Sequence, residues 1–170
     1  MKNGGSGVGR SNKNIIMVNE QNIINKILKL IDESKAIQVK KQCIELLPQL
    51  IKHLPELQNN EMRFKQAMNS IFNFINKKAK KEEEDFRGIG FNALGKISLL
   101  VHKQKIDPFL PMIFDLIDQE IKKKPIEIGR EQYNKSLQNT DVLVCIRDMS
   151  RRFGNEIEKR YSPGGKSEIG

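Results

Sequence analysis

The sequence has no tryptophan, only two cysteines and only two histidines among its 170 residues. Cys43 and Cys145 stand among apolar residues at helical spacing, which indicates small core residues in a reducing compartment rather than a disulfide framework. His53 and His102 do not cluster with cysteines and acidic residues at the spacing of metal ligands. We therefore expect no disulfide, no metal site and no cofactor.

Long hydrophobic runs are also absent. No apolar stretch approaches the roughly 20 residues that a membrane-spanning helix needs. The first residues, MKNGGSGVGRSNKN, have no apolar core like that of a signal peptide. We therefore expect a cytoplasmic protein without a membrane span, which would reach the nucleus or endomembranes through a larger complex.

Positive charge is in excess, because 30 lysines and arginines stand against 21 acidic residues and give a formal net charge of +9. Such an excess suits an acidic partner, such as nucleic acid or an anionic surface. Much of the charge lies beside acidic residues, however. In residues 77–85 four lysines lead directly into three glutamates and an aspartate. This pattern favours a solvated face.

Apolar residues recur every three or four positions along most of the chain, which is the spacing of amphipathic α-helices. The pattern predicts helices over about residues 23–31, 36–54, 64–75, 86–101, 110–121 and 143–153. Pro48 inside the second helix predicts a kink or two shorter helices. Asp107 followed by Pro108 is a start signal for the fifth helix, and Gly154 is placed to end the sixth. The residues expected in the core are Leu47, Leu50, Met68, Ile71, Leu94, Ile97, Ile113, Ile117, Ile146 and Met149.

The stretch GFNALGKIS at 90–98 differs by one residue from the phosphate-loop pattern G-x-x-x-x-G-K-[ST], because Ile97 stands where the magnesium-binding hydroxyl belongs. A phosphate loop follows a buried strand, whereas the residues before this stretch are charged and the helical spacing runs unbroken from Phe86 to Val101. Glycine costs about 1 kcal/mol in a helix interior, so a compensating contact is expected. We therefore interpret the small residues as a place where a neighbouring helix approaches closely. They are Gly88, Gly90, Ala93 and Gly95.

The predicted helices repeat in pairs. A shift of 47 residues places the second helix on the fourth, and a shift of 46 residues places the third on the fifth. Matching positions include Ile44 with Phe91, Leu47 with Leu94, Met68 with Phe114 and Ile71 with Ile117. Periods of about 40 to 47 residues with two helices per unit are typical of HEAT and armadillo arrays, whose pairs bury their apolar faces by stacking. The sequence thus predicts an all-α fold, an α-solenoid of stacked antiparallel helix pairs with about six helices.

We assign these repeats to residues 21–158. Residues 1–20 are rich in glycine, serine and asparagine and are expected to be a flexible lead-in. Residues 123–138 contain Pro125 and Gly129 without a sustained period and are expected to be an insertion loop. Residues 159–170 are expected to be a disordered tail. The second helix of a third pair is barely begun before that tail, which suggests a piece of a larger protein.

The region from about Ile24 to Glu158 resembles part of the amino-terminal HEAT region of the target-of-rapamycin (TOR) Ser/Thr protein kinases. In that family a leucine-leucine-proline helix, an alanine-leucine-glycine helix and a leucine-proline helix follow one another. Leu46-Leu47-Pro48, Ala93-Leu94-Gly95 and Leu110-Pro111 match in this order. The stretches that carry the resemblance are CIELLPQLIKHLPE at 43–56, MNSIFNFINKK at 68–78, FRGIGFNALGKISLLVHKQKIDPFLPMIFDLI at 86–117 and VLVCIRDMSRRFG at 142–154. The residues after Arg160 depart from the resemblance.

This resemblance implies a non-catalytic HEAT-repeat scaffold segment of a TOR-type kinase, which mediates intramolecular stacking and protein–protein interaction in TOR signalling. The implied partners are neighbouring repeats of the parent chain and a regulatory subunit of the TOR complex. The kinase residues themselves are missing, because the sequence has no D-F-G motif and no asparagine five positions after Asp148. We therefore expect no catalytic residue and no enzymatic activity in this chain.

A basic α-solenoid adaptor that binds nucleic acid or an acidic protein is the alternative hypothesis. Its binding would weaken steeply with salt, because phosphate contacts release counterions. The expected interaction surface has no aromatic residue among its charges on which bases could stack, which makes nucleic acid the weaker choice. The candidate residues are Lys122, Lys123, Lys124, Arg130, Arg151 and Arg152, with Lys159 and Arg160 beside them.

Overall fold

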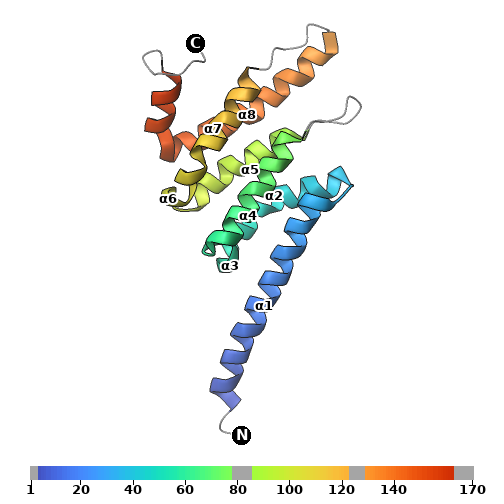
Figure 1. Ribbon diagram of the computed structural model, residues 1–170, viewed down its shortest axis with the longest axis vertical. Helices are drawn as coiled ribbons and strands as arrows, with labels where there is room; N and C mark the ends of the chain where they lie inside the picture. The colour runs from blue at the N-terminus through green and yellow to red at the C-terminus, as the bar shows by residue number, and fades with distance from the viewer. Residues whose placement is uncertain (1–3, 78–85, 123–128, 163–170) are drawn as a thin grey trace. The chain divides into compact units, whose positions relative to one another are not determined.

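The computed structural model describes residues 4–77, 86–122 and 129–162, and within these it describes the backbone alone for residues 4–18 and 129–139 (Figure 1). Every regular element in these ranges is a helix, which confirms the all-α prediction. The elements are α1 (Gly4–Glu33), α2 (Ile37–His53), α3 (Pro55–Gln58), α4 (Glu61–Asn76), α5 (Arg87–Leu100), α6 (Lys103–Ile106), the 3₁₀-helix η1 (Asp107–Phe109), α7 (Leu110–Ile121) and α8 (Gly129–Tyr161).

The chain divides into two compact units, Met1–Ser70 and Ile71–Gly170, and the boundary falls inside α4. In the first unit α1 packs against α2 and α3. Their shared core includes Ile24, Leu28, Ile44, Leu47, Ile51 and Leu57, all buried. Two polar contacts add to the packing of this unit. Gln21 Nε2 donates to Glu56 Oε1 at 3.3 Å and joins α1 to α3, and Arg63 donates to Asn25 Oδ1 and joins α4 to α1.

Asn60 starts α4. Its Oδ1 accepts hydrogen bonds from the backbone amides of Met62 (3.1 Å) and Arg63 (3.3 Å), which would otherwise have no partner within the helix. The helix then buries Phe64, Ala67 and Met68 at the spacing that the sequence predicts.

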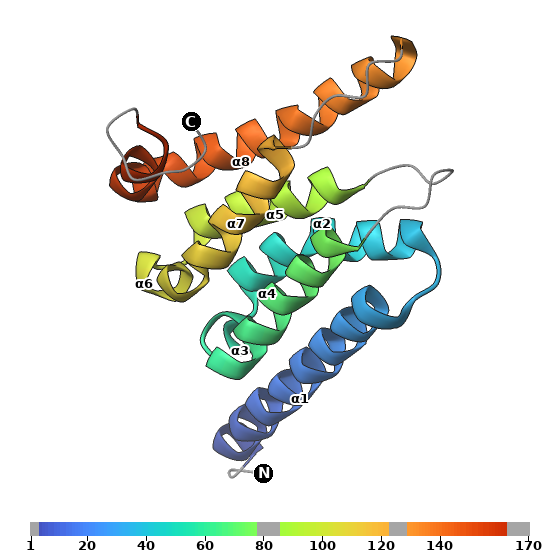
Figure 2. The same ribbon diagram turned by 45° about the horizontal axis from the view of Figure 1, so that its top comes forward.

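The second unit contains the end of α4 and all of α5 to α8 (Figure 2). Its largest fully buried side chains include Phe72, Phe91, Leu94, Ile97 and Phe153. Phe72 contacts Phe109 with ring centroids 6.1 Å apart. Aliphatic and aromatic side chains at helical spacing therefore make this core too.

Two of the ten expected core residues are not fully buried. Leu50 and Ile146 are half-buried, whereas the other eight are each at most 1% exposed. Ile146 lies beside the buried stripe of α8 rather than on it. That stripe consists of Val142, Cys145, Met149 and Phe153.

Helix α1 begins at Gly4, so helical backbone occupies residues 4–20, where composition favours a flexible lead-in. Helix growth is cooperative, because each residue added to an existing helix gains a hydrogen bond without a new nucleation step. The later turns of α1, which bury Ile24, Leu28 and Ile31, supply that nucleus.

Helix α8 begins at Gly129, so residues 129–138 of the expected insertion loop have helical backbone, while residues 123–128 lie outside the described residues. The segment GREQYNKSLQ lacks an apolar period but is rich in residues of good helix propensity, namely arginine, glutamate, glutamine, lysine and leucine. Residues 159–161 of the expected tail also belong to α8, and residues 163–170 lie outside the description.

One of the two expected helix-end signals differs from the structure. Asp107 and Pro108 open η1, and α7 starts three residues later with Phe109 at its N-cap and Pro111 in its first turn, so the expected Asp107 cap of that helix is wrong. The Gly154 signal agrees with the structure. Two helices meet within α8 at a bend at Phe153, whose φ of −116° and ψ of 27° are not helical, and the second continues to Tyr161.

Pro48 is buried inside α2, which runs as one helix from Ile37 to His53. A division into two shorter helices therefore does not occur. No helix in the described residues is long and apolar enough to span a membrane.

Candidate interaction surface

Helices α5 and α8 lie side by side and run in the same direction (Figures 1 and 2). Three contacts follow one another along the pair: Gly88 with Asp141, Gly95 with Asp148, and Lys103, just after α5, with Glu156. Since the residue number rises on both sides from one contact to the next, the helices are parallel.

The glycines of α5 permit this close approach. A Cβ added to Gly95 would lie 3.2 Å from the Cα of Cys145 and 3.3 Å from the Cβ of Asp148. A Cβ added to Gly88 would overlap the side chain of Asp141, at 2.6 Å from its Cγ. The close-packing interpretation of these glycines is therefore confirmed.

The phosphate-loop alternative at residues 90–98 does not hold, because the whole stretch lies inside α5. Its interior amides are used by the helix, and Gly90 and Gly95 are buried. The Ser98 hydroxyl, fully buried, donates to the Gly95 carbonyl at 2.6 Å. Neither the backbone nor this hydroxyl is presented to a phosphate.

Polar side chains complete the contact between α5 and α8, which we call the α5–α8 seam. Asn92 Nδ2 donates to Asp141 Oδ1 at 2.9 Å. At the other end of the seam, the Arg152 guanidinium donates to the carbonyls of Leu99, at 2.9 Å, and Val101. Arg152 therefore holds the last turn of α5, although the sequence placed it on an interaction surface.

Cys145 lies at the middle of this seam and is completely buried. Burial raises the pKa of its thiol to about 12, and the nearby Asp148 carboxylate contributes in the same direction. Because the thiolate is the nucleophilic form, this cysteine is a packing residue rather than a reactive one.

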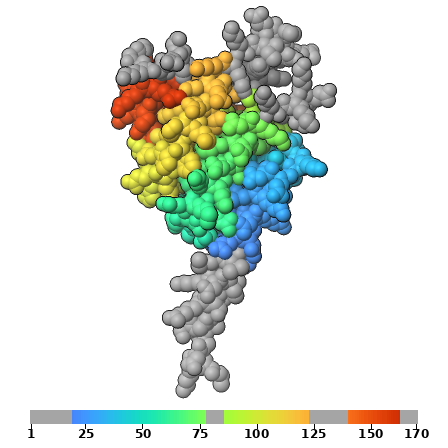
Figure 3. Space-filling view, in the orientation of Figure 1, coloured from blue at the N-terminus to red at the C-terminus, as the bar shows by residue number. Residues whose placement is uncertain are grey.

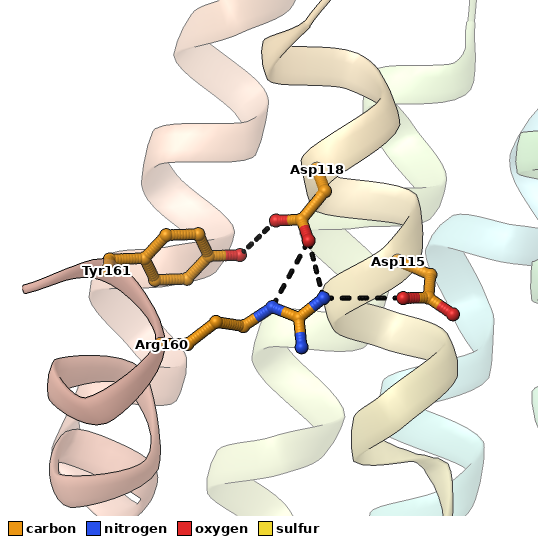
Figure 4. A network of polar contacts seen from close by, with 4 residues as sticks. All are labelled: Asp115, Asp118, Arg160 and Tyr161. Carbon is orange, nitrogen blue, oxygen red and sulfur yellow. Dashed lines mark hydrogen bonds and ion pairs between the residues drawn. The ribbon is translucent and has the colours of Figure 1, made fainter. Parts of the chain in front are cut away.

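A second polar group joins the end of α8 to α7 (Figure 4). Arg160 Nε donates to Asp118 Oδ2 at 3.1 Å, and the Tyr161 hydroxyl donates to Asp118 Oδ1 at 2.7 Å. Arg160 Nη2 also lies 3.3 Å from Asp115 Oδ1. Both carboxylate oxygens of the buried Asp118 are thus engaged, and we call this group the Asp118 cluster, consisting of Asp115, Asp118, Arg160 and Tyr161.

Aromatic contacts extend the Asp118 cluster over α7. The Arg160 guanidinium lies 5.2 Å from the centre of the Phe114 ring, and the Tyr161 ring meets Phe114 edge-on at 6.2 Å. In the space-filling view the end of α8, in red, lies against the yellow-to-orange surface of α7 (Figure 3). Burial and the bond to Asp118 raise the pKa of Tyr161, so the hydroxyl stays protonated as a donor. The cluster is a structural tie.

The expected basic surface is divided by the structure. Lys122 and Arg151 are exposed, whereas Arg152 and Arg160 are engaged with α5 and α7. Lys123 and Lys124 lie outside the described residues, and so does the side chain of Arg130.

The structure shows another surface, of which the sequence analysis named only Arg151 as a candidate. We define the outward face of α8 as Leu143, Ile146, Arg147, Ser150 and Arg151. Leu143 is 62% exposed and Ile146 is half-buried, while the other three are exposed. Arg147 and Arg151 are one helical turn apart, which was the available signal. Leu143 gave no such signal, because it is an apolar residue at the start of the helix predicted over residues 143–153.

Within the described residues, no three histidine, cysteine or acidic side chains come together as a metal site. Comparison of the chain with protein-family models, curated proteins and solved structures finds no match. The candidate interaction surface is therefore defined by its geometry alone.

Proposed function

We propose that the chain is a non-catalytic HEAT-repeat scaffold segment of a TOR-type Ser/Thr protein kinase, which stacks on neighbouring repeats and holds a regulatory subunit in the cytoplasm. The parallel packing of α5 against α8 is the observation that carries the repeat part of this proposal. In stacked helix pairs, the first helices of successive pairs run parallel to each other.

The partner helices support the same arrangement. Arg87 at the start of α5 pairs with Glu120 at the end of α7, with 3.4 Å between Nη1 and Oε2, so α5 and α7 run in opposite directions. After the bend at Phe153, the last two turns of α8 lie on α7 through the Asp118 cluster. In the proposed repeat scheme, the body of α8 is the first helix of a third pair and these last turns are its second helix. The sequence analysis found only the beginning of that second helix.

The kinase part of the proposal depends on the sequence resemblance. The environment of Asp148 supports the scaffold role. Asp148 lies in IRDM at 146–149, a stretch that is similar to the start of a kinase catalytic loop. It is 7% exposed and packs against Gly95, and Arg147 Nη2 lies 3.2 Å from its Oδ1. It faces a neighbouring helix, where no substrate could reach it.

Disulfide trapping tests the parallel arrangement. Gly88→Cys combined with Asp141→Cys should form a disulfide readily, because a Cβ added at Gly88 would lie 2.9 Å from the Cβ of Asp141, so a small shift brings the two sulfurs within bonding reach. The matched control, Gly88→Cys with Glu156→Cys, places the cysteines at opposite ends of the contact between α5 and α8 and should not cross-link. Equal cross-linking of the two pairs would contradict the arrangement.

Identification of the native polypeptide tests the kinase assignment. An antiserum against this chain should detect a very large polypeptide, and mass spectrometry of that band should find kinase-domain peptides. A band no larger than a chain of 170 residues would contradict it.

A further inference from the structure

One constant shift along the sequence places buried residues of α5 on the buried stripe of α8. The residues placed in this way are Gly90, Ala93 and Ile97 of α5, and Val101 directly after it. That stripe is Val142, Cys145, Met149 and Phe153 in the same order. The correspondence allows every face of α8 to be compared with the equivalent face of α5.

The face that receives the next helix differs between the two. On α5 this face contains Gly95, which lies against the backbone of α8. The corresponding residue of α8 is Arg147, and Arg151 follows one turn later. A helix therefore cannot approach this face of α8 as closely as α8 approaches α5.

Two further positions on α8 are more exposed than the corresponding positions on α5. Phe91 of α5 is 1% exposed, whereas the corresponding Leu143 of α8 is 62% exposed. Ser98 is completely buried, whereas the corresponding Ser150 is exposed. The described residues thus leave an apolar strip, Leu143 and Ile146, next to two arginines.

The charge of this surface has one sign. The only acidic residue between positions 142 and 155 is Asp148, which is buried and lies 3.2 Å from Arg147 Nη2. Arg147 keeps an exposed side chain in this contact (66%), and Arg151 is exposed as well. An occupant with apolar side chains flanked by carboxylates would complement this pattern.

We propose that the outward face of α8 binds an acidic amphipathic helix of a partner protein. Leu143 and Ile146 receive the apolar side chains of that helix, and Arg147 and Arg151, one turn apart, receive its carboxylates. Nucleic acid fits less well, because residues 140–152 contain no aromatic side chain for base stacking. The inference rests on the proposed scaffold function, and it names the chemistry of the partner.

The test uses the full chain and a labelled synthetic helix of about 18 residues, or five turns. In this peptide, leucines on one face are flanked by glutamates. A scrambled peptide of the same composition, with leucines on all sides, is the first control. A peptide with glutamine in place of glutamate is the second. Fluorescence anisotropy should show binding of the acidic amphipathic peptide alone, with an affinity that falls as salt is added.

Variants of the chain locate the site. Leu143→Ser should weaken binding by about fivefold, from lost apolar burial. Arg147→Gln with Arg151→Gln should weaken it by a similar factor of about five and remove most of the salt dependence. Lys96→Gln removes one exposed positive charge from α5 and should change the affinity by less than about twofold.

Three results would overturn the inference. They are absence of binding, equal binding of the scrambled peptide, and tighter binding of a double-stranded oligonucleotide. If any of them occurred while the α5–α8 disulfide formed as expected, the acidic amphipathic partner would be rejected and the scaffold proposal would be retained. Failed trapping would count against the scaffold itself, whatever the peptide does.

Discussion

The two parts of α8 are held in place by different interactions. Its body, before the bend at Phe153, packs against α5 through glycines that admit its backbone. Its last turns are held on α7 by Asp118, Arg160 and Tyr161. Close apolar packing depends little on salt or pH, whereas an ion pair depends on both. The bend therefore separates a contact that rests mainly on apolar packing from one that rests on an ion pair and responds to solution conditions.

The most severe test of the first contact places a charge in the seam core. Ile97 is completely buried, so Ile97→Asp buries an unpaired carboxylate and should destabilise the second unit by more than about 4 kcal/mol. Leu94→Asp should behave in the same way. A thermal melt followed by circular dichroism should show loss of the helical transition.

The control for this prediction lies on the same helix. Lys96 is exposed, so Lys96→Asp should shift the melting transition only slightly. If Ile97→Asp and Lys96→Asp gave the same curve, α5 would not be packed as the structure describes.

The next largest effect concerns the glycine contact. Gly95→Leu forces α5 away from the backbone of Cys145 and should cost about 1–3 kcal/mol in the free energy of unfolding. At Gly154, by contrast, an added Cβ meets no atom within 4 Å, so Gly154→Ala should stabilise the chain by about 0.4–1 kcal/mol. Urea denaturation measures both. Similar destabilisation by the two substitutions would remove the distinction between the seam and the bend.

The polar tie should respond locally. Asp118→Ala leaves Arg160 and the Tyr161 hydroxyl without their shared acceptor and should destabilise the docking of residues 154–161 by about 1–3 kcal/mol. Asp115→Ala removes one contact of a side chain that is 67% exposed and should cost less than about 1 kcal/mol.

Hydrogen exchange distinguishes these two variants. Amides in residues 154–161 should exchange faster in Asp118→Ala, while those of α5 keep their protection. Faster exchange throughout α5 and α8 would mean that the tie and the seam are one cooperative contact.

The smallest expected effect is a pH dependence. Burial and the hydrogen bond to Asp118 raise the pKa of Tyr161 above its ordinary value of 10. A raised pKa means that the protonated hydroxyl stabilises the docked state, and that this contribution is complete below pH 10 and is lost as the pH rises through the raised pKa. Tyr161→Phe should cost about 1 kcal/mol or less at neutral pH.

Tyrosinate absorbance measures this pKa. The chain has two tyrosines, so the difference between the titrations of the parent chain and Tyr161→Phe isolates Tyr161. If the difference titration gave the ordinary pKa of a tyrosine, the Tyr161 hydroxyl would not be held by Asp118 in solution.

The seam was predictable from the sequence and the tie was not. Apolar period located α2, α4, α5 and α7 to within a few residues, because buried apolar residues recur at helical spacing along each of them. Gly88 and Gly95 pointed to close packing because glycine is unfavourable inside a helix. The short helices α3 and α6 have four residues each, too few to show a period.

The Asp118 cluster depends on the geometry of the bend. Its partners are 42 and 43 residues apart in the chain, and they meet only because α8 changes direction at Phe153. Residue types alone suggested an exposed arginine near the end of the helix. Most of the outward face of α8 was missed for a related reason, since the helical period cannot tell whether a second helix covers Leu143.

The common direction of α5 and α8 has an electrostatic consequence. The first of the two helices joined in α8 stops at the bend at Phe153, beside the end of α5. Two carbonyl ends, each with a partial negative charge, therefore lie at the same end of the pair, where they repel one another. Arg152 lies there on the last carbonyls of α5, and Lys103 Nζ lies 5.3 Å from the centre of the Phe153 ring at the bend of α8. These cations offset the repulsion between the aligned dipoles, and a pair of parallel rods without them would tend to splay apart at that end.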